Sequence, residues 1–141
     1  MTRNAKRTTG RQTTRAGQDE GHAYRPDLTN WPHSWMGVPD DLLPGRRIVA
    51  YFQPFLEDLV QRSLSRKTFR KHLNNLWLLG GEIIRDLNQT PSLGNVPIER
   101  LVFDLVQDGG PLLHHSDSEE ESRSFESTCR RFRRFLEQLP R

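Results

Sequence analysis

Four basic side chains stand in the first seven residues of the stretch SRKTFRKHLNNLWLLGGEIIRDL, residues 65–87: Arg66, Lys67, Arg70 and Lys71. Lysine and arginine are the side chains that most often contact phosphates in nucleic-acid interfaces. The four cations are spaced as two i, i+4 pairs, and in a helix like charges at this spacing repel each other. A helix start also carries a partial positive charge that favours Asp or Glu. A bound anion would explain why cations stand there instead.

Two interpretations of this cluster are open. In the first, an anion binds the free N–H groups of the first helical turn and the four side chains hold it, which is the geometry of a phosphate site. Asn74 and Asn75 then extend the polar surface by one turn. In the second interpretation, the cluster is a solvated helix face whose cations pair with acids from another helix. The first predicts nucleic-acid contacts from Arg66, Lys67, Arg70, Lys71 and Asn74.

A second basic group lies near the end of the chain, where Arg130 and Arg134 share one face of a predicted helix. This helix begins with Glu119, Glu120 and Glu121, so its charges follow the helix dipole and require no ligand. As evidence for binding it is therefore weaker than the cluster after Ser65. We include Arg130 and Arg134 as further candidate nucleic-acid contacts.

Other reactive residue types give no catalytic set, because no nucleophile stands with a base and no carboxylates pair on an apolar background. Cys129 falls on the apolar face of an amphipathic helix, which predicts a buried thiol. The positions of this face are Phe125, Cys129, Phe132, Leu136 and Leu139. His72 is expected at the boundary of the core. His114 and His115 have no third metal ligand at a suitable spacing. We therefore expect no enzyme activity, no metal and no cofactor.

The spacing of apolar residues predicts helices and no strands, so the expected fold is all-α, a small bundle of about four helices. In the second helix, Ser65 is the expected N-cap and Trp77 falls in the main buried stripe. Gly80 with Gly81 suggests a close helix crossing or a bend. Pro54 predicts a kink or a break in the first helix. Pro97 suits the first position of the third helix. The expected helices span about 46–62, 65–87, 97–108 and 117–139.

Charge and composition divide the chain into three parts. Residues 1–29 contain few apolar side chains, and five basic residues with no acid stand among the first 17, which predicts a disordered basic tail. Residues 30–45 hold Trp31 and Trp35 among prolines, which predicts an extended strap over the core; alternatively, the two tryptophans dock onto a protein partner. Residues 46–141 form the helical domain.

Cellular location follows from what the chain lacks. One cysteine permits no internal disulfide, which fits a reducing compartment. No apolar run approaches the roughly 18 residues that a membrane span requires, so neither a signal peptide nor a membrane anchor is expected. The sequence thus predicts a cytoplasmic protein with no membrane partner.

The segment FLEDLVQRSLSRKTFRKHLNNLWLLGGEIIRDL resembles the helical core-binding domain of tyrosine recombinases and phage integrases. The resemblance rests on the pattern S-x-x-T-x-x-x-H-x-x-x-L, here Ser65, Thr68, His72 and Leu76, and it covers less than a third of the chain. It implies a helical fold whose basic helix start faces a DNA backbone. The chain departs from the family because no tyrosine follows Tyr51 and too little chain follows residue 90 for a catalytic domain.

Two classes of function remain after these exclusions. The first is a non-enzymatic nucleic-acid-binding helical protein that contacts the phosphate backbone, with DNA favoured over RNA. The second is a helical protein–protein interaction or regulatory module, in which the basic residues only keep the domain in solution.

Overall fold

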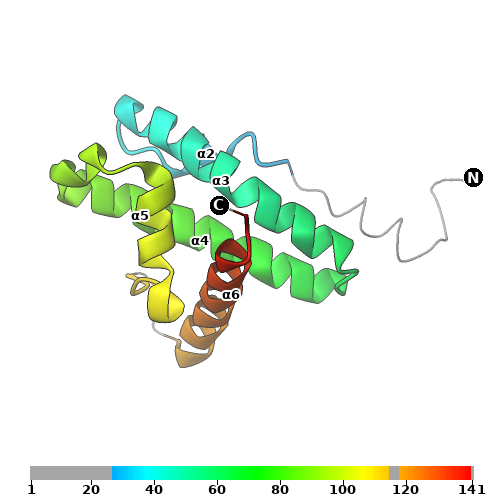
Figure 1. The fold of residues 1–141 in the computed structure, drawn as a ribbon. Coiled ribbons are helices and arrows are strands. Elements are labelled where there is room, and N and C mark those ends of the chain that lie inside the picture. Colours follow the sequence, from blue (N-terminus) through cyan, green and yellow to red (C-terminus); the bar gives the residue numbers. More distant parts are fainter. Residues whose placement is uncertain (1–26, 115–117, 141) are drawn as a thin grey trace, which may run out of the picture.

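The computed structural model describes residues 27–114 and 118–140, and within them the chain forms helices and no strand (Figure 1). The all-α prediction is therefore confirmed. Five α-helices are present in these residues: α2 Trp31–Trp35, α3 Leu42–Gln61, α4 Arg66–Gln89, α5 Ile98–Leu105 and α6 Glu119–Glu137. Three short 3-10 helices connect them: η1 Pro39–Asp41, η2 Pro91–Asn95 and η3 Gln107–Gly109.

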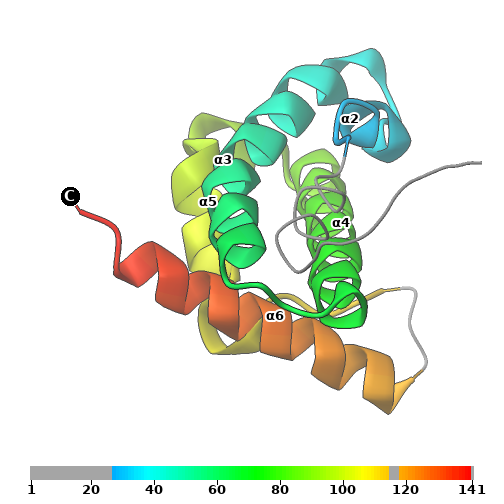
Figure 2. The same cartoon turned by 90° about the vertical axis from the view of Figure 1, so that its right-hand side faces the viewer.

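Helices α3 and α4 lie side by side in opposite directions, and α6 crosses both of them (Figures 1 and 2). A tight turn joins α3 to α4, and Ser63 within it adopts a positive φ of 56°. Helix α5 packs against α3, while α2 rests on both α3 and α4. This arrangement places the start of α4 close to α6.

Aromatic side chains form the centre of the core between α3 and α6. The ring of Phe132 stacks on Phe55 with centroids 4.8 Å apart and meets Phe52 edge-on at 5.5 Å. The predicted apolar face of α6 is confirmed, since its members are buried: Phe125, Cys129, Phe132 and Leu136. Leu139 was predicted to belong to it but is 40% exposed, because α6 ends at Glu137.

The beginning of the described chain differs from the sequence prediction. Of the tail predicted over 1–29, residues 1–26 lie outside the described residues, but residues 27–29 are ordered and Leu28 is buried in the core. The strap predicted over 30–45 is not extended, because residues 31–35 form α2 and residues 39–41 form η1. Helix α3 then begins at Leu42 rather than near Arg46, and it continues through Pro54 without a break.

The two glycines in α4 accommodate the close approach of Trp35, the last residue of α2. The indole of Trp35 lies directly on Gly80, where a Cβ atom would stand only 2.1 Å from Cζ2 of the ring. Trp35 is consequently buried, and its Nε1–H donates to the backbone oxygen of Trp77 at 2.9 Å. The prediction that Trp77 is buried was wrong, since its side chain is 40% exposed. Trp35, rather than Trp77, is the tryptophan that belongs to the buried core.

The remaining connections agree with the sequence in outline. Helix α4 extends to Gln89, and η2 forms within the predicted loop. Pro97 is the N-cap of α5 rather than its first helical residue, which corrects the prediction by one position. After η3, Gly110 adopts a φ of 87° and turns the chain toward α6. The side chain of Ser118 caps α6 by accepting a hydrogen bond from the backbone N–H of Glu121.

Candidate nucleic-acid interface

The start of α4 presents the predicted basic cluster to solvent. The hydroxyl of Ser65 caps the helix, as expected, by accepting a hydrogen bond from the backbone N–H of Thr68 at 3.2 Å. The first turn contains no acidic residue, so nothing there complements the positive end of the helix dipole. The five predicted site residues on this helix are all exposed: Arg66, Lys67, Arg70, Lys71 and Asn74.

Pairing with acids does not account for most of this cluster. Among residues 27–114 and 118–140, no ion pair involves Lys67, Arg70 or Lys71. The nearest acid further along α4 is Glu82, which is buried and binds the ring Nδ1 of His114 at 2.5 Å. The second interpretation requires acids that pair with these cations, and the described residues supply none for these three side chains.

Helix α6 brings a different arginine to the cluster than the sequence predicted. Arg130 is exposed, but its Nη2 lies 3.8 Å from Oε1 of Glu126 on the side of α6 that meets Gly109. Arg134 is exposed without an ion pair to a described residue. Arg131 instead lies on the side of α6 that faces α4, where its charge and that of Lys71 both act on His72.

A buried polar network fixes this junction between α4 and α6. The ring Nδ1 of His72 lies 2.7 Å from the hydroxyl oxygen of Thr128. The side-chain amide of Asn75 donates to the same oxygen at 2.8 Å and to the backbone oxygen of Ser124 at 3.1 Å. His72 and Asn75 were predicted at the core boundary and on the polar surface, but both are buried. They point toward α6, whereas Asn74 faces solvent.

Burial, aided by the charges of Arg131 and Lys71, lowers the pKa of His72 to about 4. The ring is therefore neutral near pH 7. In that state the hydroxyl of Thr128 can donate to Nδ1 while its oxygen accepts from Asn75. The charges of Lys71 on α4 and Arg131 on α6 both act on this ring, so each helix contributes a cation near the junction.

Mild acid should weaken the fold through His72. The folded-state pKa lies below the ordinary value of 6.5, so the unfolded chain binds the proton more tightly. The contribution of His72 to the free energy of unfolding is complete well above pH 6.5 and is lost as the pH falls toward 4. The loss should reach about 2 kcal/mol at pH 5. Chemical unfolding at pH 7 and pH 5 should show this loss in the parent and a smaller loss in His72→Gln. An equal pH dependence in the two proteins would contradict the assignment.

Trp31 and Trp35 were the candidate contacts for a protein partner, and the structure changes this pair. Trp35 is buried and unavailable, and Trp31 is partly buried with its ring centroid 5.7 Å from that of Trp35. Trp77 is the exposed tryptophan of the described residues. Its indole Nε1–H donates to the hydroxyl of Ser34 on α2 at 2.9 Å.

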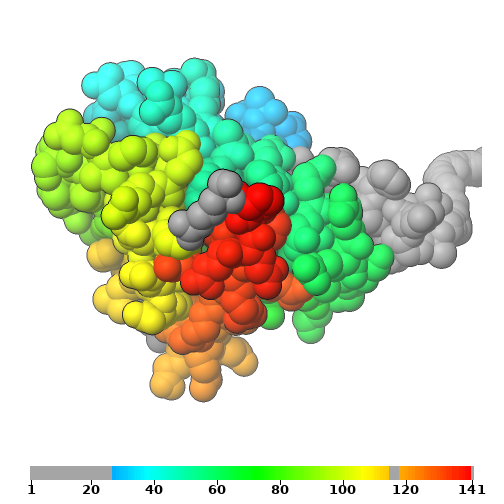
Figure 3. Space-filling model, in the orientation of Figure 1, coloured from blue at the N-terminus to red at the C-terminus, as the bar shows by residue number. Residues whose placement is uncertain are grey.

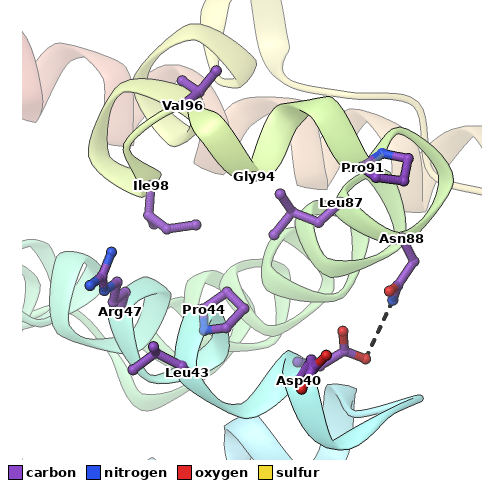
Figure 4. Close-up of a pocket in the computed structure, with 11 residues that line it drawn as sticks. Asp40, Leu43, Pro44, Arg47, Leu87, Asn88, Pro91, Gly94, Val96 and Ile98 are labelled. Carbon is purple, nitrogen blue, oxygen red and sulfur yellow. Dashed lines mark hydrogen bonds between the residues drawn. The ribbon is translucent and has the colours of Figure 1, made fainter.

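A cavity of about 490 Å³ lies elsewhere, between the start of α3 and the end of α4 (Figure 4). Its walls are mainly apolar and include Leu43, Pro44 and Leu87. Its buried carboxylate, Asp41, accepts hydrogen bonds from the backbone N–H groups of Gly37 and Val38 and from the amide of Asn88. Burial would raise the pKa of Asp41, but these bonds together outweigh it and lower the pKa. Asp41 thus has a structural role.

Residue types that could support catalysis or metal binding are placed unfavourably. Cys129 is buried, and burial, aided by the charge of Glu126, raises the pKa of its thiol to about 12. In the described parts of the chain, no three His, Cys, Asp or Glu side chains are close enough to hold a metal ion. The absence of enzyme activity and of a cofactor remains a prediction.

The surface next to the α3–α4 turn therefore holds several cations, of which Lys67, Arg70 and Lys71 have no ion pair to a described residue. Figure 3 shows α6 beside this turn, on the face that also carries α5. We call the group the basic seam and define it by its residues: Arg66, Lys67, Arg70 and Lys71 of α4 with Arg131 of α6. All are exposed except Arg131, which is partly buried.

None of the helices in the described residues combines the length and the apolar character needed to cross a membrane. Comparisons with protein-family models, with curated proteins and with solved structures give no match to this chain. The resemblance to the core-binding domain of integrases thus remains an interpretation of residues 55–87.

Proposed function

We propose that this chain is a non-enzymatic nucleic-acid-binding protein that holds a phosphate backbone along the basic seam. One observation carries the proposal: Lys67, Arg70 and Lys71 have no ion pair among the described residues, and α6 adds Arg131 beside them. Leaving like charges together costs stability unless an anionic ligand compensates for it. Acting in the cytoplasm would fit the single buried cysteine. DNA is favoured over RNA only by the integrase resemblance.

The alternative is a helical protein–protein interaction or regulatory module. Exposed apolar side chains near η1 support it, since Leu43 is 58% exposed and Val38 is 47% exposed. Leu43 also lines the cavity of Figure 4, which has apolar walls that a partner side chain could fill. In this alternative the basic seam has no ligand.

A salt titration distinguishes the two functions. The test variant changes Lys67, Arg70 and Lys71 to Gln, and it leaves Arg66 in place because that residue has a further interaction. Removing three phosphate contacts should weaken binding to mixed-sequence DNA or RNA. It should also reduce the slope of log affinity against log salt by about two to three. Anisotropy of a labelled oligonucleotide measures both quantities.

A matched control removes the same net charge elsewhere, by changing Arg46, Arg47 and Arg100 to Gln. Arg46 and Arg47 lie at the opposite end of α3 from the turn, and Arg100 lies on α5. This control should keep most of the affinity and the salt slope of the parent. Equal losses in the two variants would mean that only net charge matters. A parent that binds neither nucleic acid at low salt would overturn the proposal and favour the interaction module.

A further inference from the structure

The exposed indole of Trp77 lies in line with the basic residues of α4. Arg70, Asn74 and Trp77 are spaced i, i+4 and i+7, which places them on one face of the helix. All three are exposed, and seven residues of helix separate Arg70 from Trp77 by about 10 Å. No acidic residue stands between Ser65 and Gly81. The basic seam therefore continues into a flat aromatic surface.

Contacts from α2 hold this indole at one edge. The Nε1–H of Trp77 donates to the hydroxyl of Ser34, and that hydroxyl donates to the backbone oxygen of Trp31 at 2.7 Å. The backbone oxygen of Trp77 accepts from the buried Trp35. An exposed ring that is fixed in this way loses less conformational entropy on binding than a free side chain.

We propose that α4 binds single-stranded nucleic acid, with phosphates on Lys67, Arg70 and Lys71 and an unpaired base stacked on Trp77. Proteins that bind single strands combine a basic track for the backbone with aromatic rings on which bases stack. In a duplex the base faces are already stacked on each other, so Trp77 has nothing to add to duplex binding. This inference rests on the proposed function and specifies that its nucleic-acid ligand is single-stranded.

Charge argues for this ligand over a protein partner. Arg70 and Asn74 share the exposed face of α4 with the ring, and Lys67 and Lys71 are their helical neighbours at i−3. Lysine is depleted in protein–protein interfaces, whereas arginine and tryptophan are enriched there. A polyanion satisfies the cations and the ring at once, because each nucleotide supplies a phosphate and a flat base. A protein partner would need an acidic surface adjoining an apolar one.

The test uses the full chain and one oligonucleotide, offered as a single strand and as a duplex with its complement at the same salt concentration. The variants Trp77→Phe and Trp77→Leu both keep an apolar side chain, but only phenylalanine keeps a ring. The parent should prefer the single strand. Trp77→Leu should weaken single-strand binding by roughly 5- to 150-fold, the contribution of one stacked base, and change duplex binding less than twofold. Trp77→Phe should retain most of the affinity.

Other results would overturn the inference, and they separate it from the proposed function. Equal single-strand affinity in Trp77→Leu and the parent would refute stacking. If the Lys67, Arg70 and Lys71 variant still lost binding, the proposed function would stand. Equal weakening of single-strand and duplex binding by Trp77→Leu would show that Trp77 only positions α2. A parent that binds neither form overturns both proposals. Thermal melts of each variant establish that it is folded.

Discussion

Replacing Gly80 by alanine should destabilise the fold by about 3 kcal/mol, although alanine is the better helix former. The added Cβ would lie 2.1 Å from Cζ2 and 2.4 Å from Cη2 of Trp35, distances that no pair of non-bonded carbon atoms tolerates. The indole is rigid and its Nε1–H is bonded to the backbone oxygen of Trp77, so relief requires moving the whole of α2. Denaturant unfolding of the variant and the parent measures the loss.

The neighbouring glycine provides the matched control. A Cβ at Gly81 would meet Cδ1 of Trp35 at 3.5 Å, which is ordinary van der Waals contact. Gly81→Ala should therefore be neutral or stabilising by up to about 1 kcal/mol, through helix propensity alone. Combining Gly80→Ala with Trp35→Ala should cost less than the sum of the single changes, because the new Cβ at position 80 no longer meets an indole ring. Similar midpoints for Gly80→Ala and Gly81→Ala would contradict the placement of Trp35.

Replacing Phe132 by alanine should cost about 3 to 5 kcal/mol, the usual range for a fully buried aromatic side chain. Its ring is inaccessible and contacts Tyr51, Phe52 and Phe55 of α3, at centroid distances of 6.0, 5.5 and 4.8 Å. The variant leaves a cavity where α3 and α6 meet. The denaturant midpoint should fall accordingly, with an unchanged dependence of unfolding free energy on denaturant.

Phe135, three residues further along α6, is the comparison for Phe132. It is partly buried and contacts Phe55 at 5.5 Å. Phe135→Ala should cost clearly less than Phe132→Ala, about 1 to 2 kcal/mol, since part of its surface is already in water. Equal losses would mean that the centre of the core has been assigned to the wrong turn of α6.

Residue spacing predicted the long helices well, because their apolar faces repeat over several turns. Ser65 was also correctly placed as a cap, since a hydroxyl before a helical run has a specific role there. Helix α2 was missed because five residues contain too little of a repeat, and Pro32 within them suggested an extended chain. Local sequence thus predicts regular helices and fails where a short segment is held by tertiary contacts.

The tryptophans and the site show the same limit. Gly80 and Gly81 indicated that something approaches α4 closely, but only the fold shows that it is Trp35. The cations of α4 were selected as candidate contacts because the helix dipole and their mutual repulsion both disfavour them there. Arg131 was not selected, because the sequence cannot tell which side of α6 faces α4, whereas the contacts of Ser124 and Thr128 with Asn75 identify that side.

The buried network of His72 and Asn75 also determines the register of α6 on α4. The apolar positions of α6 recur every three or four residues, so sliding the helix by four residues would put Cys129 in the place of Phe125 and Leu136 in the place of Phe132, although Arg133 would then take the place of Cys129. That shift would place Phe132 where Thr128 stands, leaving the amide of Asn75 and Nδ1 of His72 without partners at a cost of about 1 to 3 kcal/mol each. These buried polar groups therefore disfavour the slipped packing, which would also move Arg131 away from Lys71.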